Sequence, residues 1–469
     1  MTSRIQLRLP AVTFRSVQLW TAIVVLVLAP LFFGSVDLFW LSFWTILLSI
    51  GTLCGVAVPM STGQSRLLFG FLVLCGIYAV LAIVQITPHL VDQLNDPVWH
   101  RANDLLGLDA LPRISSRAEL PPLAIGHFLL FAASFASGFS AGTLPRDGDR
   151  LIWFAQYSIL LYAIYGLIAL VFTPNMVLWA PKLAYRGSLT ATFINHNTAA
   201  TLVGAGAILW FCSAFSSLQQ SFRLTSIRLL LLNRSNEQLA SQVIARSGAA
   251  LTCFFALLLT GSRGGLICSC LGLLVAIVLM VANRQKQKFW HILVWGGVAL
   301  AGTVALLGRL GRIRSQGLFD DARWSVYEFC VEAIRQRPLL GAGMGTFEDL
   351  FPSLRASNFY SWGVWDYAHS TILEIAVEMG IPMAAMVVIA ALVSLAILAC
   401  ATITAEGRSR RSLAAISGIA VLSYLHSLID FSLQIPGYLA LFGILLGCGL
   451  ARASADSSPV GAARLRLPA

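Results

Sequence analysis

Charged residues are scarce in this sequence: Asp, Glu, Lys and Arg together make up 11% of its 469 residues, whereas 57% are hydrophobic. A soluble globular domain carries about 25% charged residues, because it needs a hydrated surface around its core. The mean hydropathy of +0.78 is likewise typical of a chain surrounded by lipid. The shortage of charge therefore excludes a set of water-soluble domains, although the length alone would allow several.

Cysteine patterns that bind metals are also missing. The nine cysteines include no C-x-x-C pair and no His/Cys spacing suited to zinc. Eight of them lie in or beside apolar runs, where cysteine behaves as a small hydrophobic residue. Cys330 falls in a long polar segment and has no evident disulfide partner. We therefore expect neither a metal site nor a bound cofactor.

The sequence also lacks the pattern of a basic groove. The formal net charge is +11, but the basic residues are scattered in short loops between apolar runs. Nucleic-acid-binding proteins gather Lys and Arg on one face or along one helix, often with aromatic residues between them. The positive charge therefore does not indicate a nucleic-acid partner, and it is better read as an orientation signal.

Long apolar runs dominate what remains, and a helix needs about 20 mostly apolar residues to cross a bilayer. The first run follows three arginines, lacks a convincing cleavage site and is followed at once by further runs, so we interpret it as an uncleaved helix. The expected fold class is all-α, a polytopic membrane protein with about twelve transmembrane helices. The expected spans are 17–34, 36–58, 67–87, 121–143, 151–174, 193–215, 247–262, 265–283, 289–308, 370–402, 411–430 and 435–452.

Three connections between these spans are long, namely 88–120, 216–246 and 309–369. If the N-terminus lies in the cytoplasm, the inner side holds 19 of the 32 Lys and Arg residues but only 5 of the 21 acidic residues. Short cytoplasmic loops of membrane proteins carry such an excess of Lys and Arg. The sequence therefore predicts cytoplasmic termini and a large periplasmic loop between helices 9 and 10.

In this topology four polar features converge on the outer side. They are Arg186 with the segment 190–197, the turn 260–265 containing Arg263, Arg323 in the longest loop, and His369 before the tenth span. An arginine in a tight turn at the membrane surface has little water around it and needs an anionic partner. Its planar fork suits phosphate oxygens. The three arginines therefore predict a diphosphate held at the interface without a metal ion.

Each feature also has a structural interpretation, which the sequence leaves open. Arg263 could reach the outer lipid headgroups, and Arg323 could be a solvated loop charge. His369 could cap a helix or satisfy a buried polar group. Asn195 and Asn197 are possible substrate contacts, but His196 and Asn197 could instead be helix-start residues.

The segment 320–337 predicts one amphipathic helix that lies on the membrane surface. Its apolar stripe consists of Trp324, Tyr327, Val331 and Ile334. Pro338 ends the helix, and the glycine run 341–345 follows. That run could cradle phosphate, but it lacks the Lys-Ser/Thr ending of a nucleotide-binding loop. We favour a turn that returns the chain to the membrane.

Together these segments resemble the O-antigen ligase and polymerase superfamily of bacterial membrane glycosyltransferases, over roughly residues 186–436. The resembling motifs are Thr192-Phe193-x-Asn195-x-Asn197, Gly261-Ser262-Arg263-Gly264, Arg323 through Pro338 to Gly341, Gly343, Gly345 and Phe347, His369-Ser370 with Gly380, and His426 to Asp430-Phe431 with Pro436. Their order, spacing and common sidedness make the resemblance specific. Two departures are His196, where the family often has proline, and Met383, which replaces a small or polar residue.

The resemblance implies an enzyme that moves a glycan from undecaprenyl diphosphate to a sugar hydroxyl at the periplasmic face of the inner membrane, in lipopolysaccharide or surface polysaccharide assembly. Arg186, Arg263 and Arg323 would stabilise the leaving diphosphate in place of a metal. His369 would be the base that activates the acceptor, and one-step attack would invert the anomeric carbon. The implied partners are the lipid-linked glycan, a glycolipid or glycan acceptor, and membrane lipid.

The same resemblance divides the chain into three parts. Residues 1–174 form helices 1–5, residues 175–453 form the O-antigen ligase-like core with loop 309–369, and residues 454–469 form a cytoplasmic tail. This division is an expectation from the family, since the first five helices match it only in character.

Two other functions stay open. A polymerase, which joins lipid-linked repeat units, needs a second cationic site, for which the long loop offers Arg309, Arg312, Arg314, Arg335, Arg337 and Arg355. A secondary transporter usually has polar groups and broken helices near the bilayer midplane in both halves. The charged groups here gather at one surface in the second half, which favours the enzyme.

Overall fold

The computed structural model describes residues 14–55, 58–90, 92–224, 237–282, 321–354 and 365–455. Within these ranges the chain is almost entirely helical, so the expected all-α membrane fold is confirmed in kind. The strands in this part of the chain, β1 (Met176–Val177) and β2 (Ala180–Pro181), form one short antiparallel pair with Met176 opposite Pro181.

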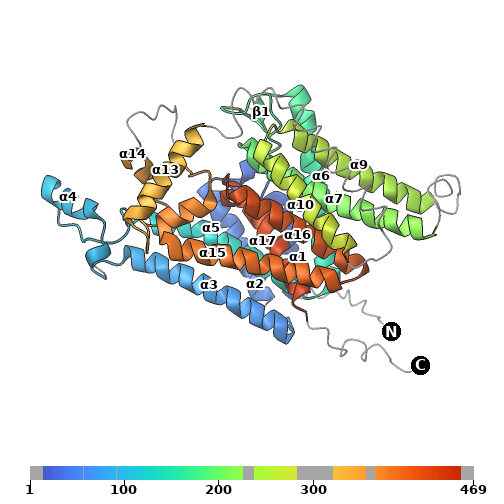
Figure 1. Cartoon of the computed structure of the whole chain (residues 1–469), viewed down its shortest axis with the longest axis horizontal. Coiled ribbons are helices and arrows are strands. Elements are labelled where there is room, and N and C mark those ends of the chain that lie inside the picture. Colours follow the sequence, from blue (N-terminus) through green and yellow to red (C-terminus); the bar gives the residue numbers. More distant parts are fainter. Residues whose placement is uncertain are drawn as a thin grey trace, which may run out of the picture.

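The helices pack into a single bundle from which α4 projects at the left edge of Figure 1. Their bounds are α1 Phe14–Leu28, α2 Leu38–Cys54, α3 Thr62–Ile86, α4 Pro97–Leu106, α5 Leu120–Gly142, α6 Pro145–Phe172, α7 His196–Leu224, α9 Glu237–Leu259, α10 Arg263–Val281, α13 Asp321–Gln336, α14 Phe347–Leu354, α15 Thr371–Thr404, α16 Gly407–Ser427 and α17 Pro436–Ala453. Short 3-10 turns are η1 Phe33–Ser35, η2 Asp92–Leu94 and η4 Ser432–Gln434.

The number of membrane-crossing helices is only partly settled. Eight helices in the described ranges are long and apolar enough to span a membrane. Helices α1 and α2 are apolar but have only 15 and 17 residues, and α16 is a less apolar helix of 21 residues. These eleven helices each overlap an expected span, whereas the twelfth expected span, 289–308, lies outside the described residues. The count of twelve therefore stays a prediction.

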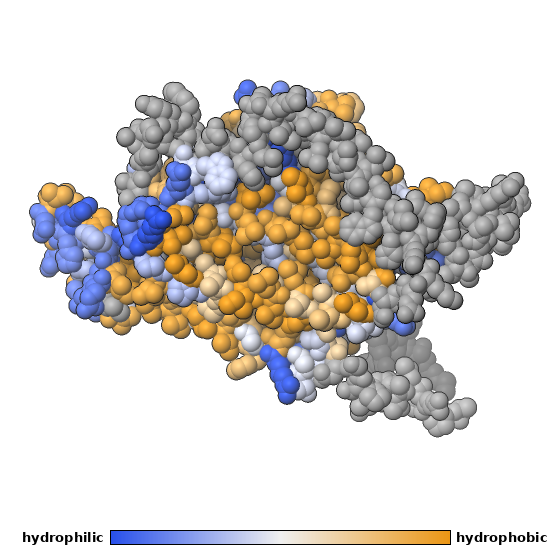
Figure 2. All heavy atoms as spheres, viewed as in Figure 1, coloured by the Kyte–Doolittle hydropathy of each residue, from blue (hydrophilic) through white to orange (hydrophobic). Residues whose placement is uncertain are grey.

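Helices differ in how far they are enclosed by their neighbours. In α7 and α17, 94% and 89% of the most apolar window is buried, whereas in α3 only 6% is buried. Figure 2 shows the consequence, a broad apolar band over the helices with polar residues gathered at the left end around α4. A lipid-facing helix must be apolar on its outside, while a central helix can carry polar groups that find partners within the protein.

Close contact between α5 and α17 joins the N-terminal half of the chain to its last helix. A Cβ atom added at Gly138 would lie 2.0 Å from the carbonyl oxygen of Ile444. At Gly447 it would lie 2.1 Å from the carbonyl oxygen of Phe135. Small residues let helix backbones approach this closely in lipid, where van der Waals packing replaces the hydrophobic effect as the main attraction between helices.

Helix α15 was expected as one continuous span but breaks at Gly380, which has φ +84°. The segment after α13 inserts at this break, where the N–H of Ile381 donates to the carbonyl of Pro338 at 2.8 Å. Gln85 of α3 completes the junction, since its Nε2 donates to the carbonyls of Leu340 and Glu378 at 2.7 Å each. The segment that follows α13 is therefore fixed to the membrane helices at the break in α15.

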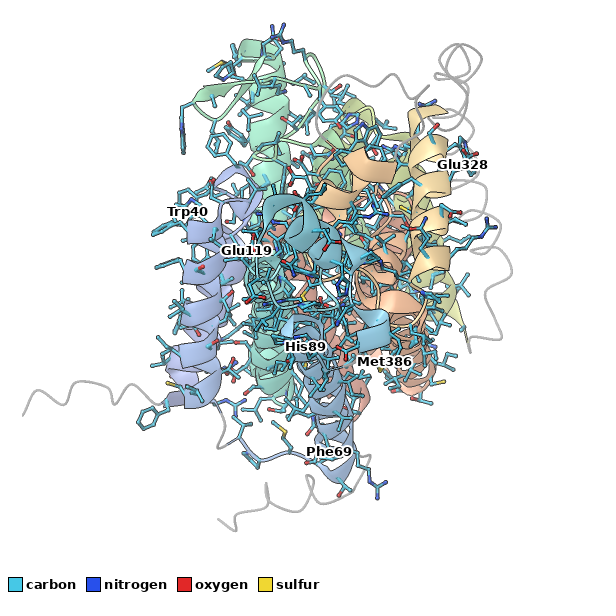
Figure 3. All side chains as sticks on the ribbon, turned by 90° about the vertical axis from the view of Figure 1, so that its left-hand side faces the viewer. Trp40, Phe69, His89, Glu119, Glu328 and Met386 are labelled. Carbon is cyan, nitrogen blue, oxygen red and sulfur yellow. The ribbon has the colours of Figure 1, made fainter. Side chains whose placement is uncertain are left out.

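The amphipathic helix expected at 320–337 is present as α13, but its apolar face was assigned wrongly. Trp324 and Val331 are 54% and 41% exposed. The buried face consists of Val326, Phe329, Cys330 and Ala333, which pack with Phe347 and Phe351 of α14. This face is the buried one because α14 and α15 cover it. In Figure 3, Glu328 on α13 and Trp40 on α2 point away from the bundle on opposite sides.

Candidate active site

The entry to α7 is a polar turn stabilised by its own side chains. The Oδ1 of Asn195 accepts a hydrogen bond from the N–H of Asn197 at 2.7 Å, and its carbonyl accepts one from Ala199 at 3.2 Å. This is helix N-cap geometry. His196 and Asn197 are the first two residues of α7, as their structural interpretation has it. The Nδ2 of Asn195 is nevertheless buried without a hydrogen-bond partner. One donor of Asn195 is therefore unused.

Asp430 lies at the centre of the polar cluster, in the turn between α16 and η4. Its side chain is 1% exposed. The Oδ2 atom accepts a hydrogen bond from Nδ2 of Asn197 at 2.6 Å. The same oxygen is 3.6 Å from Nη2 of Arg323 and 3.8 Å from Nδ1 of His369. Asp430 thus brings together three of the residues predicted from the sequence.

Arg323 reaches this carboxylate from the first turns of α13. Its Nη1 donates to the carbonyl of Ile429 at 2.9 Å, so the guanidinium spans the turn that carries Asp430. One helical turn later, the hydroxyl of Tyr327 donates to the carbonyl of His369 at 3.0 Å. Helix α13 therefore positions both the arginine and the histidine. The interpretation of Arg323 as a solvated loop charge is wrong, because its side chain is only 23% exposed and ion-paired.

His369 is held in an unusual backbone conformation. Its φ is +52°, a left-handed value that is uncommon for a residue other than glycine. The ring packs edge-on against Trp365 and Phe431, with centroid distances of 5.1 and 4.8 Å. Nδ1 is buried without a hydrogen bond, at ion-pair distance from Asp430. The cap of α15 is Ser370 rather than His369, so the histidine ring is not used as a cap.

Glu374 fixes the segment that carries this histidine. Its Oε2 accepts from the N–H of Ala368 at 2.7 Å, and its Oε1 accepts from Nε2 of Gln434 at 2.7 Å. The carboxylate therefore joins the residue before His369 to the turn that follows Asp430. Because both of its oxygens accept hydrogen bonds, the Glu374 carboxyl group restrains both segments.

The charge of Asp430 is maintained by its surroundings. Burial alone would raise the pKa of this carboxyl group, but His369, His426 and Arg323 together hold it below its ordinary value. A carboxylate with a lowered pKa stays ionised at neutral pH and favours the protonated form of a neighbouring imidazole. Asp430 can therefore both orient His369 and stabilise the imidazolium.

Arg263 is the first residue of α10, where Ser262 is the N-cap and its hydroxyl accepts from the N–H of Gly265 at 3.0 Å. The next residue, Gly264, lies against the Asp430 turn: a Cβ there would be 2.7 Å from Cδ1 of Ile429. The Arg263 turn therefore borders the cluster through its backbone.

Arg186 lies at the margin of the cluster. Its side chain is exposed, and its Nε donates to the carbonyl of Lys182 at 3.2 Å. The preceding residue, Tyr185, stacks on His196 at 4.1 Å. Burial raises the pKa of Tyr185, the charge of Asp430 raises it further, and that of Arg323 opposes this. Tyr185 therefore faces the cluster, whereas Arg186 is not shown to reach it.

Three helices begin around the Asp430 turn. Helix α7 reaches it through Asn197, α10 through Gly264, and α15 through the hydroxyl of Thr371, which donates to the carbonyl of Asp430 at 3.5 Å. The N-terminus of a helix carries a partial positive charge and favours anions. Together with Arg323 and Arg263, these helix ends form a site suited to a negatively charged group. In the described ranges no three His, Cys, Asp or Glu residues are grouped to hold a metal ion.

Sequence reasoning missed two members of this cluster. Asp430 and His426 were part of the family resemblance but were given no role. In the structure, Nδ1 of His426 lies 2.9 Å from the Thr201 hydroxyl and 3.1 Å from the Ser432 hydroxyl. The available signal was an aspartate directly after an apolar span, which needs a cationic partner when it is buried.

The glycine run 341–345 is not a phosphate cradle. The N–H of Ala342 donates to Val377, that of Gly343 to Glu378, and that of Met344 to Oε1 of Gln85, at 2.9 to 3.0 Å. These donors are satisfied within the protein and are not available to a ligand. The favoured interpretation, a turn that returns the chain to the membrane, is therefore correct.

Comparison with known families gives one match. Residues 248–388 match the family model described as O-antigen ligase. This range contains Arg263, Arg323 and His369, whereas Asn197 and Asp430 lie outside it. No curated protein matches the sequence.

Proposed function

We propose that this chain, a member of the O-antigen ligase superfamily by the match of residues 248–388, transfers a glycan from undecaprenyl diphosphate to a sugar hydroxyl. We further propose that it does so at the periplasmic face of the inner membrane. The observation that carries the proposal is the cluster of His369, Asp430 and Arg323 beside three helix N-termini. Such a transfer needs a base to activate the acceptor hydroxyl and a cationic surface to stabilise the leaving diphosphate, and this cluster offers both.

The cationic side of the cluster would stabilise the leaving group. When the bond between the anomeric carbon and the diphosphate oxygen breaks, negative charge develops on that oxygen. Arg323 and Arg263, with the helix N-termini, can offset this charge without a divalent ion. Arg186 would contact the diphosphate from the margin of the site. We therefore expect metal-independent transfer.

His369 would act as the base. Its Nδ1 faces Asp430, which leaves Nε2 for the acceptor hydroxyl. The acceptor oxygen attacks the anomeric carbon, its proton moves to His369, and the diphosphate leaves from the opposite face. One such displacement inverts the anomeric configuration. Asp430 stabilises the imidazolium that forms, as carboxylates do in other base–carboxylate pairs. Asn197, hydrogen-bonded to the same carboxylate oxygen, positions this group, and Asn195 could contact substrate with its free donor.

Two of the six cations suggested for a second diphosphate site lie in the described ranges, and both are ion-paired. Arg337 is ion-paired with Asp96, and Arg335 lies 3.9 Å from Glu332. These two charges are therefore already compensated. The other candidates, Arg309, Arg312, Arg314 and Arg355, lie outside the described residues. A ligase needs one diphosphate site and an opening for a glycolipid acceptor, so we propose the ligase first and keep the polymerase as the alternative.

Transfer by the purified protein from a lipid-linked oligosaccharide tests the proposal. Arg323→Ala and His369→Ala should each reduce the rate by about 10²–10⁴-fold, the range for losing one charge-stabilising or proton-transferring group. Arg323→Lys should rescue poorly, because a point charge cannot replace the bidentate fork. The matched control is Arg335→Ala on the same helix, whose exposed side chain pairs with Glu332 and should be dispensable.

Two results would contradict this mechanism. One is a rate that vanishes with a chelator and returns with magnesium. The other is full activity in His369→Ala. In cells, deletion of the gene should leave long carrier-linked chains but remove them from the glycolipid core. Single repeat units in place of long chains would indicate the polymerase, and an unchanged surface glycan with defective solute uptake would indicate a transporter.

A further inference from the structure

Most cations at the end of the bundle opposite the candidate site have partners. The Nε of Arg15 is 2.9 Å from Asp147, and Arg150 lies 3.8 Å from the same carboxylate. Asp149 accepts from Arg452 at 2.8 Å and is 3.3 Å from Arg408. These contacts use the two carboxylates that α6 presents at this end.

Arg411 is different. It lies in the first turns of α16, is partly buried, and has no hydrogen-bond or ion-pair partner among the described residues. It lies within electrostatic reach of Arg246 and Arg408, and the nearest compensating charge, Asp149, is already paired twice. Arg246, near the middle of α9, donates to the hydroxyl of Ser217. Arg246, Arg408 and Arg411 therefore lie near one another, and Asp149 is the one carboxylate of the described ranges that compensates Arg411.

Such a cluster is unfavourable by itself. Like charges repel strongly where the surrounding medium is less polar than water. The cluster also lies near the N-terminus of α16, the end at which the helix dipole disfavours cations. Arg246 and Arg411 are half-buried, whereas Arg408 is exposed. An anion bound between these arginines would offset their repulsion, and the guanidinium fork matches phosphate oxygens well.

The depth of the arginine cluster relative to the membrane indicates the source of that anion. Trp153, one turn after Asp149 on α6, is 50% exposed, and Tyr157 is 43% exposed. Exposed Trp and Tyr mark the depth of the lipid headgroups in membrane proteins. Helices α9 and α16 begin, and α7 ends, at the right-hand side of Figure 1, opposite α13 and the start of α10. A phosphate at this depth belongs to a phospholipid.

We propose that Arg246, Arg408 and Arg411 form a binding site for the phosphate of an anionic phospholipid headgroup. Helices α6, α7, α9 and α16 contribute the surrounding side chains. The site is separate from the candidate active site and does not depend on the proposed glycan transfer. Its ligand would hold together the ends of helices that otherwise repel each other through their arginines.

Lipid binding to the purified full-length protein tests this site. Phosphatidylglycerol and phosphatidylcholine are added separately to the detergent-solubilised protein, and retained lipid is measured by native mass spectrometry. The wild type should prefer phosphatidylglycerol. Arg411→Gln should weaken its binding about fivefold, the contribution of one cation near an anionic lipid surface. Arg411→Lys, which keeps the charge, should retain most of the binding.

Arg150→Gln is the matched control. It removes a cation at the same end of the bundle, and this cation is already paired with Asp147. It should leave lipid binding unchanged. Equal retention of the two lipids by the wild type would overturn the proposal. So would an equal loss in Arg150→Gln and Arg411→Gln, which would indicate attraction by the general positive charge. If inorganic phosphate alone displaced all bound phosphatidylglycerol at low concentration, the site would belong to free phosphate instead.

Discussion

Asp430 joins groups that are far apart in the chain. It contacts Asn197, Arg323 and His369, and its turn also borders the start of α10. A buried carboxylate with one cation, one imidazole and one amide around it has its charge compensated from three sides. Removing its charge therefore affects the base and the anion site together, even though Asp430 itself touches no substrate in the proposed mechanism.

We expect Asp430→Asn to lower the rate of glycan transfer by about 10²-fold or more, while leaving donor binding largely intact. Asparagine keeps the size and hydrogen-bonding capacity of the side chain but cannot stabilise the imidazolium of His369. Steady-state kinetics should therefore show a loss mainly in kcat. A change confined to KM would instead indicate that Asp430 only organises the binding site.

The pH dependence of stability gives the structural control for this variant. Since the folded-state pKa of Asp430 lies below its ordinary value of 3.8, its ionised form stabilises the fold above that pH. This contribution is lost as the pH falls through the lower, folded-state pKa. The difference in stability between wild type and Asp430→Asn should therefore be constant at neutral pH and shrink in acid.

Among the elements, α15 is the one whose irregularity has a consequence for the site. It starts directly after His369 and breaks nine residues later at Gly380, where the segment following α13 is inserted. Its first part thus links the histidine to the element that carries Arg323. A Cβ at Gly380 would lie 2.2 Å from the carbonyl oxygen of Leu339, so this junction leaves no room for a side chain.

Gly380→Ala should therefore destabilise the protein by about 1–3 kcal/mol, the range for forcing a residue into such a backbone region. The added methyl group should also displace α13 relative to α15, so transfer activity should fall as well. The matched control is Gly76→Ala in the lipid-facing helix α3, where an added Cβ meets nothing within 4 Å. That change should be neutral or slightly stabilising. Equal thermal stability of the two variants would contradict the inserted-junction explanation.

For the whole molecule, the main property is that the two ends of the bundle differ in chemistry. The candidate site and the inserted segment 338–346 lie at one end, and the arginines of α6, α9 and α16 lie at the other. The positive-inside rule, applied to the short loops, predicts that this second end faces the cytoplasm. The proposed reaction requires this orientation, since its site must face the periplasm.

Cysteine labelling in intact spheroplasts tests this orientation. A cysteine placed at Glu328, which is exposed on α13 and points away from the bundle in Figure 3, should react with an impermeant thiol reagent. A cysteine at Gln238, exposed at the start of α9, should react only after the membrane is permeabilised. The parent is a variant without Cys400, which is an exposed native cysteine. The reverse pattern would place the candidate site in the cytoplasm and exclude a periplasmic transfer.

The sequence by itself determined the membrane class, most of the helices and several residues of the candidate site. Apolar length is a local property, so eleven helices could be predicted without knowing their neighbours. Arg263, Arg323 and His369 could be singled out because a charge or imidazole beside an apolar run is conspicuous in any sequence.

Tertiary structure decided which of these groups meet and what completes the site. The role of Asp430 depends on contacts with Asn197, Arg323 and His369, which lie 233, 107 and 61 residues away in the sequence, and no local pattern reports such contacts. The buried face of α13 depends on the presence of α14 and α15, because an amphipathic helix with apolar residues on two neighbouring faces buries whichever face is covered. The break in α15 likewise depends on the segment inserted there, whose backbone leaves room only for glycine at position 380.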